Sequence, residues 1–121
     1  MTFRTRFAPS PTGPLHLGHA YSALLAHDRA RAEAGEFLLR IEDLDRSRCR
    51  DHFEAQIYED LEWLGIRWDG AVRRQSEHAD VYDAVLSDLT ARGLTFACCC
   101  SRSDIQAAIA HNQFKRLDKL K

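Results

Sequence analysis

The spacing of apolar residues at the start of the chain predicts a short strand, a turn and then a helix. Phe3 and Phe7 alternate with two arginines, which is the two-residue period of a β-strand. The prolines and glycine of residues 9–14 exclude both a helix and further ladder pairing, so the chain is expected to turn there. From about Gly18 the spacing becomes helical, and Gly35 is expected to stop that helix.

The next segments repeat the alternation of strand and helix. Residues 36–43 are largely apolar and predict a buried strand, and residues 51–64 predict a helix with one apolar face, closed by Gly65. A strand, a helix and a strand in about forty residues form a βαβ unit, whose strands are parallel and whose crossover is right-handed.

The second half of the chain is expected to continue in the same way. Ser76 is predicted to be the N-cap of a helix that ends at Gly93, residues 94–98 are predicted to form a strand, and Ser101 with Asp104 predicts a capping box for a last helix. The side chains expected to turn inward from the Ser76 helix are Val81, Val85, Leu86 and Leu89. The whole pattern predicts an α/β, Rossmann-like fold with a mainly parallel sheet and flanking helices.

Two histidines stand where the first loop gives way to the first helix. A helix N-terminus offers unpaired amide donors and a positive dipole end, so an anion near His16 and His19 would be stabilised there. Gly18, between them, leaves room for a flat ring or a phosphate to approach the backbone. The pattern predicts a nucleotide phosphate site, with a simple helix cap or a surface position as the alternative for each histidine.

Composition narrows the setting of the chain. Its 121 residues suit one domain, and the net charge of −1 gives no general electrostatic case for nucleic acid, so any RNA contact would be local. We find neither the apolar run of a signal peptide nor the roughly 18 apolar residues of a membrane span. We therefore expect a cytoplasmic protein without a membrane partner. The full-length protein is expected to be a monomer.

Cysteine and lysine are both unevenly distributed. Three of the four cysteines, Cys98, Cys99 and Cys100, are consecutive, which does not suit a disulfide framework and favours small buried residues at a strand end. The three lysines all lie in the last seven positions, whereas 13 of the 14 arginines precede residue 111. This break suggests the hypothesis that residues 111–121 are a foreign, frame-shifted or truncated end attached to a domain of residues 1–110.

Three stretches together resemble the glutamate-specific class I aminoacyl-tRNA synthetases. Residues 16–19 (HLGH) resemble the H-I-G-H signature of the class, residues 6–13 (RFAPSPTG) resemble the opening of its glutamate-specific members, and residues 40–43 (RIED) resemble their second-strand motif. The resemblance covers about residues 3–105 and implies that residues 1–110 form the N-terminal half of the nucleotide-binding catalytic domain.

The resemblance implies an ATP-dependent ligase. L-glutamate would be activated by ATP, with Mg²⁺, as an adenylate and then transferred to tRNA. His16, Gly18 and His19 would bind ATP, and the two histidines would be catalytic because they stabilise charge on the phosphoryl oxygens.

The same resemblance implies a glutamate pocket on the first two strands. Arg6 would pair with a substrate carboxylate, Ser10 would add a hydroxyl contact, and Glu42 would accept hydrogen bonds from the substrate ammonium. Phe7, Ala8 and Pro9 would complete the pocket. The alternative is that Arg6 and Glu42 form an ordinary ion pair.

Other features of the resemblance concern zinc and the choice of tRNA. Relatives with a zinc-binding insertion carry a C-x-C pair, so Cys98 and Cys100 are zinc candidates, with His111 as a further ligand. Leu44 and residues 73–78 (RRQSEH) favour the glutamyl-Q tRNA(Asp) synthetases, which load the queuosine of tRNA(Asp), over ordinary glutamyl-tRNA synthetases that use tRNA(Glu).

The family's second ATP motif, a K-M-S-K-S-like loop, is absent from the sequence. We therefore expect a fragment or a degenerate copy, and a non-catalytic remnant that binds ATP or glutamate is a further alternative.

Overall fold

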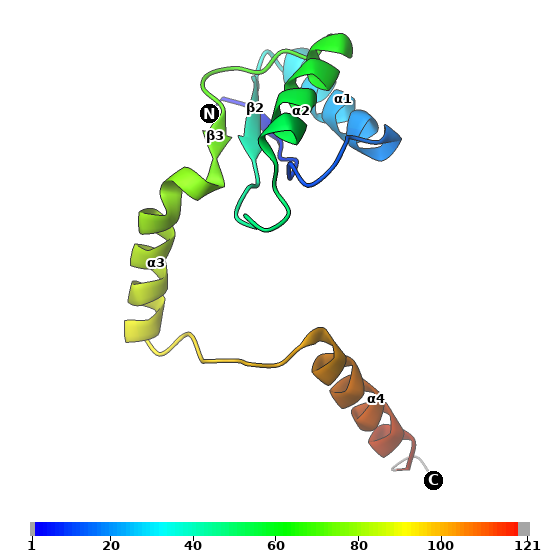
Figure 1. Cartoon of the computed structure of the whole chain (residues 1–121), viewed down its shortest axis with the longest axis vertical. Coiled ribbons are helices and arrows are strands. Elements are labelled where there is room, and N and C mark those ends of the chain that lie inside the picture. Colours follow the sequence, from blue (N-terminus) through cyan, green and yellow to red (C-terminus); the bar gives the residue numbers. More distant parts are fainter. Residues whose placement is uncertain (1, 119–121) are drawn as a thin grey trace. The chain divides into compact units, whose positions relative to one another are not determined.

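The computed structural model describes residues 2–118, with side chains described as far as residue 111, and divides into two compact units (Figure 1). The units are Met1–Asp83 and Ala84–Lys121. Among the described residues, no helix is long and apolar enough to cross a bilayer.

The first unit is built on a parallel sheet of three strands in the order β1-β2-β3. The strands are β1 (Arg4–Phe7), β2 (Glu36–Ile41) and β3 (Arg73–Arg74), joined by helices α1 (Leu17–Ala32) and α2 (Asp51–Trp63). The predicted α/β fold with a parallel sheet is therefore confirmed. The third strand has only two residues.

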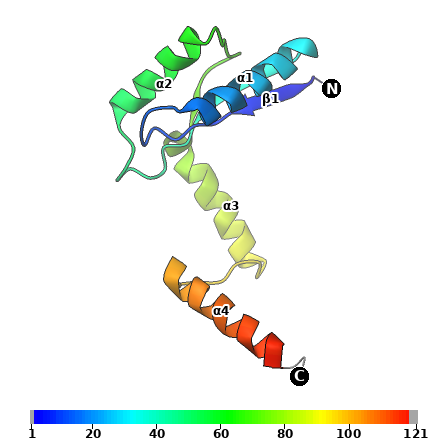
Figure 2. The ribbon, with the colours of Figure 1, turned by 90° about the vertical axis from the view of Figure 1, so that its right-hand side faces the viewer.

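The core of this unit lies on one face of the sheet. Phe37, Leu39 and Ile41 alternate along β2 and are buried in one cluster with residues of α1 and α2, because two right-handed crossovers that step the same way along a sheet cover the same face. Figure 2 shows α1 lying along β1. The remaining buried apolar residues of the cluster are Phe7, Ala23, Ala30, Ile57, Leu61 and Ile66. The opposite face carries charged side chains, among them Arg4 and Arg6.

The first helix ends before the position that the sequence predicted. It stops at Ala32, and Ala34, not Gly35, takes the left-handed conformation with φ of 48°. Gly35 is needed for a different reason, since a Cβ there would lie 2.3 Å from the carbonyl oxygen of Phe3. The glycine permits β1 to approach the start of β2.

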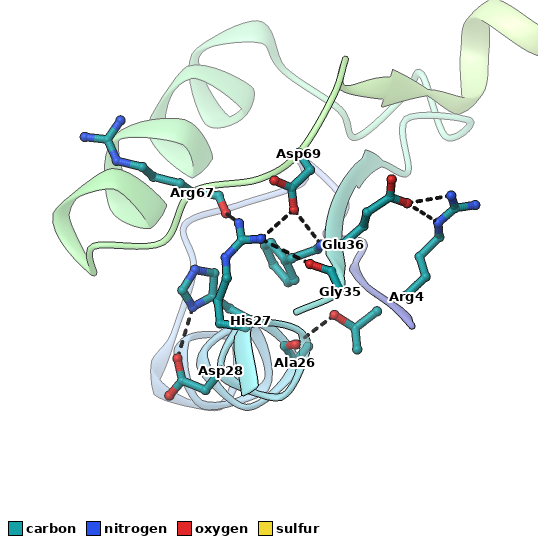
Figure 3. A network of polar contacts seen from close by, with 11 residues as sticks. Arg4, Ala26, His27, Asp28, Gly35, Glu36, Arg67 and Asp69 are labelled. Carbon is teal, nitrogen blue, oxygen red and sulfur yellow. Dashed lines mark hydrogen bonds and ion pairs between the residues drawn. The ribbon is translucent and has the colours of Figure 1, made fainter. Parts of the chain in front are cut away.

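A polar network fastens the amino end of β2 to the first helix (Figure 3). Asp69 Oδ2 accepts hydrogen bonds from Arg31 Nη1 at 2.7 Å and from the Phe37 backbone N–H at 2.8 Å. Arg31 also donates through Nη2 to the carbonyl of Arg67 at 2.6 Å. The network joins the end of α1, the start of β2 and the segment after α2, at the opposite end of the strands from the loops that follow them.

Ser76 does not have the predicted capping role. It lies in a 3₁₀ helix, Gln75–His78, which precedes α3 (Ala79–Ala91). Its backbone N–H and its hydroxyl instead donate to the Asp43 carboxylate, at 2.9 and 2.5 Å. The serine therefore links the end of β2 to the segment after β3.

The apolar face predicted for this helix is not covered. Val81, Val85 and Leu86 are exposed, Leu89 is partly exposed, and no residue of α3 is buried. The expectation that these side chains turn inward is wrong for the described residues.

The end of the chain contains one wrong prediction and one confirmed prediction. Residues 94–98 form no strand and are mostly exposed. The last helix, α4 (Arg102–Asp118), does begin with the predicted capping box: Ser101 N–H donates to Asp104 Oδ2 at 2.7 Å, and Asp104 N–H donates to Ser101 Oγ at 3.2 Å. The helix runs through the boundary predicted at residue 111; the foreign origin of residues 111–121 stays a prediction, and residues 119–121 lie outside the described part.

Candidate functional site

The candidate site lies at the carboxyl ends of β1 and β2, where parallel sheets bind ligands. The loop after β1 and the first residue after β2 are held together, since Glu42 N–H donates to the carbonyl of Pro9 at 2.9 Å. A cavity of about 660 Å³ opens between them and the start of α1.

All six residues predicted to bind glutamate line this cavity: Arg6, Phe7, Ala8, Pro9, Ser10 and Glu42. They come together because the proline-rich turn carries the chain from β1 across the end of β2. His19, from the first turn of α1, lines the same cavity. The structure thus brings the predicted glutamate residues and one predicted ATP residue into one space, while their binding roles stay predictions.

Four further lining residues were not predicted: Thr12, Gly13, Pro14 and Ser22. Ser22 lies three residues after His19 on α1, and residues at that spacing share a helix face. The helical spacing after the H-x-G-H motif could therefore have identified Ser22. The other three belong to the turn that the sequence had already placed beside the site.

Glu42 lies between two arginines. Its Oε1 accepts a hydrogen bond from Arg40 Nη2 at 2.5 Å, and the same oxygen lies 3.8 Å from Arg6 Nη1. The ordinary ion pair that was the alternative for Arg6 is thus present in a loose form, with the Arg6 side chain 48% exposed. Arg40 is an addition to the predicted set, and the two-residue period of β2 places it on the same side as Glu42.

The Arg40 side chain is constrained by its surroundings. Its Nε atom is buried and has no hydrogen-bond partner among the described residues, so Nη2 makes its polar contact with Glu42. A buried N–H group without a hydrogen-bond partner destabilises the folded state. The Arg40 guanidinium therefore does not occupy this position because it is well solvated there.

The two histidines cap the first helix. His16 is the N-cap, and its Nδ1 accepts a hydrogen bond from Gly18 N–H at 3.1 Å, while His19 Nδ1 accepts one from His16 N–H at 3.3 Å. The two rings stack with centroids 3.8 Å apart and planes 21° apart. Both histidines therefore have the capping role that was the alternative to ATP binding, in a geometry that leaves their other ring nitrogens uncommitted by these bonds.

Gly18 serves the cap directly. A Cβ at this position would lie 3.0 Å from His16 Cε1 and 3.2 Å from its Nδ1. The His16 ring thus lies beside Gly18, and the approach of a ligand to the Gly18 backbone stays a prediction. Neither His16 nor Gly18 lines the cavity that contains His19.

Burial and the neighbouring His16 both lower the pKa of His19, burial having the larger effect. Since an ordinary histidine titrates near 6.5, His19 is neutral at pH 7. The histidine in the cavity acts there as a hydrogen-bonding group without net charge.

The cysteines do not form a metal site in the described part of the chain. Cys98, Cys99 and Cys100 are exposed, so the expectation that they are buried at a strand end is wrong. Among the described residues, no group of three or more histidine, cysteine or acidic side chains could hold a metal ion, whereas structural zinc takes four ligands. The described residues do not fit zinc, so the predicted zinc site at Cys98, Cys100 and His111 is not supported by the structure.

Comparison with known proteins agrees with this geometry. The family described as tRNA synthetases class I (E and Q), catalytic domain, matches residues 2–119. A glutamyl-Q tRNA(Asp) synthetase of Rhodobacter capsulatus is 60% identical over 109 residues, covering 90% of this chain and 39% of that protein. A glutamate–tRNA ligase of Hydrogenobaculum is 48% identical over 103 residues, covering 85% of this chain and 22% of that protein.

The fold is also shared with a solved structure. The crystal structure of a glutamate tRNA ligase from Elizabethkingia meningosepticum, in complex with its amino acid, matches 95% of this chain and 24% of that chain, with a TM-score of 0.73 and 35% identity. This chain therefore spans well under half the length of these relatives. The family match covers nearly all residues of this chain, and the parallel sheet with a site at the carboxyl ends of its strands agrees with it. This chain therefore belongs to the family of class I tRNA synthetase (E and Q) catalytic domains.

Proposed function

We propose that this chain supplies the ATP- and glutamate-binding part of a ligase that activates L-glutamate with ATP and Mg²⁺ and transfers it to tRNA. The observation that carries the proposal is the single cavity in which a cation, Arg6, and an anion, Glu42, lie beside His19 at the start of a helix. An acidic amino acid has carboxylates that need a cationic partner and an ammonium group that needs an anionic one. The phosphates of ATP need hydrogen-bond donors beside that amino acid.

The residues divide the work of substrate binding by charge. Arg6 would hold a glutamate carboxylate, and Glu42, oriented by Arg40, would accept hydrogen bonds from the ammonium group. The α-carboxylate oxygen would then attack the α-phosphorus of ATP, forming the acyl–phosphate bond as the bond to pyrophosphate breaks. The protein contributes position and hydrogen bonds, and it forms no covalent intermediate.

The favoured acceptor is the queuosine of tRNA(Asp). Leu44 and residues 73–78 support this choice, as does the name of the R. capsulatus relative. The alternative is part of an ordinary glutamyl-tRNA synthetase acting on tRNA(Glu), a name carried by other relatives. A cytoplasmic location and a monomeric full-length form belong to the same proposal.

ATP–pyrophosphate exchange with glutamate tests the activation step. In the assay, residues 1–110 of this chain replace the matching part of the R. capsulatus protein, and the chimera is compared with its His16→Ala, His19→Ala double variant. We expect exchange without tRNA and its loss in the double variant. Exchange no greater than that of the double variant would refute the ligase proposal, and ATP or glutamate binding without exchange would favour a non-catalytic remnant.

The acceptor is tested separately. The active chimera is given glutamate, ATP and either tRNA(Asp) bearing queuosine or tRNA(Glu). Because residues 1–110 are the only part from this chain, the unmodified R. capsulatus protein is assayed beside it. A shift of the chimera towards tRNA(Glu) would identify the ordinary synthetase as the better assignment.

A further inference from the structure

The segment after β3 is tied to the chain directly beyond β2 by two hydrogen bonds. Ser76 N–H donates to Asp43 Oδ1 and the Ser76 hydroxyl donates to Asp43 Oδ2, although the two residues are 33 positions apart. Burial raises the pKa of Asp43, but the hydrogen bonds, chiefly those from Ser76, outweigh this effect and hold the pKa below its usual 3.8. Asp43 is therefore a carboxylate at neutral pH, and a bond to each oxygen fixes its orientation.

Asp43 follows Glu42 directly, and their side chains face different cavities. Glu42 lines the cavity of about 660 Å³ that contains the predicted glutamate residues, whereas Asp43 and Ser76 line a separate cavity of about 250 Å³. Successive side chains of an extended chain point to opposite sides. A carboxylate held on one side therefore fixes the direction of its neighbour on the other side.

The strand ladder does not extend to Glu42, because the pairing of β2 with its neighbours ends at Ile41. Two ties hold the chain just past that point. Glu42 N–H donates to the carbonyl of Pro9 at 2.9 Å, and Asp43 accepts the two bonds from Ser76. The backbone of Glu42 is thus held by the turn after β1 and by the segment after β3.

Ser76 is a firm support because its own segment is fixed to α2. Arg74, two residues earlier, donates through Nε to Glu54 Oε1 at 2.7 Å, and its Nη2 lies 2.6 Å from the same oxygen. That oxygen also accepts a hydrogen bond from the Tyr58 hydroxyl, and the Glu54 side chain is only 15% exposed. Ser76 therefore imposes a position on Asp43.

We propose that Ser76 is a positioning residue for glutamate, which holds the Asp43 carboxylate and thereby keeps Glu42 aimed into the cavity beside Arg6. The binding of glutamate by Glu42 rests on the proposed function, whereas the tie itself rests on the geometry alone. On this proposal Ser76, within residues 73–78, serves the binding of the amino acid, apart from any part that this stretch has in the choice of tRNA.

Hydrogen–deuterium exchange read by mass spectrometry tests the tie without substrates. It is measured on the whole 121-residue chain and on the chimera. We expect Ser76→Ala to speed exchange in peptides containing Glu42 by about tenfold, because a hydrogen bond to a charged group is lost, while Ser76→Thr keeps the hydroxyl and should exchange like the original. Ser47→Ala is the matched control, since it removes a serine bond to Asp45 within the same loop.

Kinetics of pyrophosphate exchange in the chimera test whether the tie serves glutamate. Ser76→Ala should raise the KM for glutamate by about five- to tenfold and leave the KM for ATP within about twofold, because only the direction of Glu42 is lost. Ser76→Thr should restore the glutamate KM, and Ser47→Ala should leave both KM values unchanged. A merely structural role would instead raise both KM values together.

A double variant tests whether Ser76 acts through Asp43. Asp43→Ala should have effects at least as large as those of Ser76→Ala, and combining them should change neither the exchange rate nor the KM further, since the hydroxyl has already lost its partner. Unchanged exchange at Glu42 in Ser76→Ala, an equal rise in the KM for ATP, or additive effects in the double variant would overturn the proposal. If the unmodified chimera lacks exchange activity, the proposed function fails, and the deuterium exchange still decides whether Ser76 holds Glu42.

Discussion

Two arginines on β1 share a face of the strand and have different partners. Arg4 forms an ion pair with Glu36, with Nη2 2.5 Å from Oε2, whereas Arg6 lines the cavity and lies 3.8 Å from Glu42. Their separation along the strand, and not their direction, decides which one meets the site, because only Arg6 is near the carboxyl end.

We expect Arg6→Lys to lower kcat/KM for glutamate in the chimera by roughly ten- to hundredfold, since a hydrogen bond to a charged group contributes about 1.5–3 kcal/mol. Arg4→Lys is the matched control and should stay within a few-fold, because its Glu36 partner lies outside the cavity. Equal losses in the two variants would show that Arg6 has no special contact with glutamate.

Arg40 provides a second prediction at this scale. Arg40→Gln should raise KM for glutamate by about three- to tenfold, because Glu42 loses its nearest cation, at about 1 kcal/mol for a partly exposed pair. The KM for ATP should change little, and Arg40→Lys should restore part of the glutamate affinity. Arg73, the register partner of Arg40 on β3, is the control, and an equal effect of Arg73→Gln would indicate only a general change in surface charge.

At the scale of elements, the close approach of β1 to the start of β2 depends on Gly35. Gly35→Ala should lower the free energy of unfolding by about 2 kcal/mol or more, because a Cβ 2.3 Å from the Phe3 carbonyl oxygen forces the strands apart. The melting temperature should fall accordingly. Gly13→Ala, whose Cβ would meet open space, should melt close to the original chain. Thermal unfolding followed by circular dichroism compares them, and identical melting curves would contradict the assigned contact.

The Asp69 network should make stability depend on acidity. The hydrogen bond from Arg31, followed by that from the Phe37 N–H, lowers the pKa of Asp69 below its usual 3.8. The folded state therefore prefers the carboxylate, so the contribution is complete well above pH 3.8 and is lost as the pH falls through and below that value.

Asp69→Asn should thus lower the melting temperature at pH 7. As the pH is lowered, the melting temperature of this variant should decrease less than that of the original chain. Melting curves at intervals from pH 7 to pH 2.5 measure both effects. Asp60→Asn, on α2 and outside the network, should keep the acid dependence of the original chain. If the Asp69 and Asp60 variants show the same pH profile, the network does not couple folding to protonation.

At the scale of the whole molecule, the described buried core belongs to one unit. Among the described residues, the nine members of the hydrophobic core lie between Phe7 and Ile66, whereas α3 exposes Val81, Val85 and Leu86 by 46–55%. Parallel sheets normally bury both faces, yet within the unit Met1–Asp83 the helices α1 and α2 pack on one face of this sheet. Uncovered apolar surface and open strand edges favour association between copies.

We expect the isolated chain to self-associate at micromolar concentration in size-exclusion chromatography with light scattering. Val85→Lys with Leu86→Lys should shift it towards monomer without lowering the melting temperature, because neither side chain belongs to the core. Ala84→Lys with Ser87→Lys adds the same charge to α3 and leaves the large apolar side chains in place. This control should therefore reduce self-association less than the Val85→Lys, Leu86→Lys variant does. A monodisperse monomer of the unchanged chain would contradict the prediction.

The sequence alone was sufficient for the features that depend on local periodicity. The alternation around Phe7, the turn of residues 9–14 and the apolar pattern of residues 36–43 predicted a parallel α/β unit, and parallel strands bring their carboxyl ends to one edge. Arg6 and Glu42, distant in sequence, were expected in one pocket because their motifs resemble those of a known family, and they line one cavity because they lie at that edge.

Tertiary structure decided the partners of individual side chains. Ser76 had the local signature of an N-cap, but Asp43, 33 residues away, takes both its hydrogen bonds; Gly35 resembled a helix stop, but its role comes from the Phe3 carbonyl. Residues 94–98 had the composition of a strand, yet a strand also needs a neighbour to pair with. A local pattern encodes which conformations a segment prefers, whereas its contacts depend on where distant parts of the chain return.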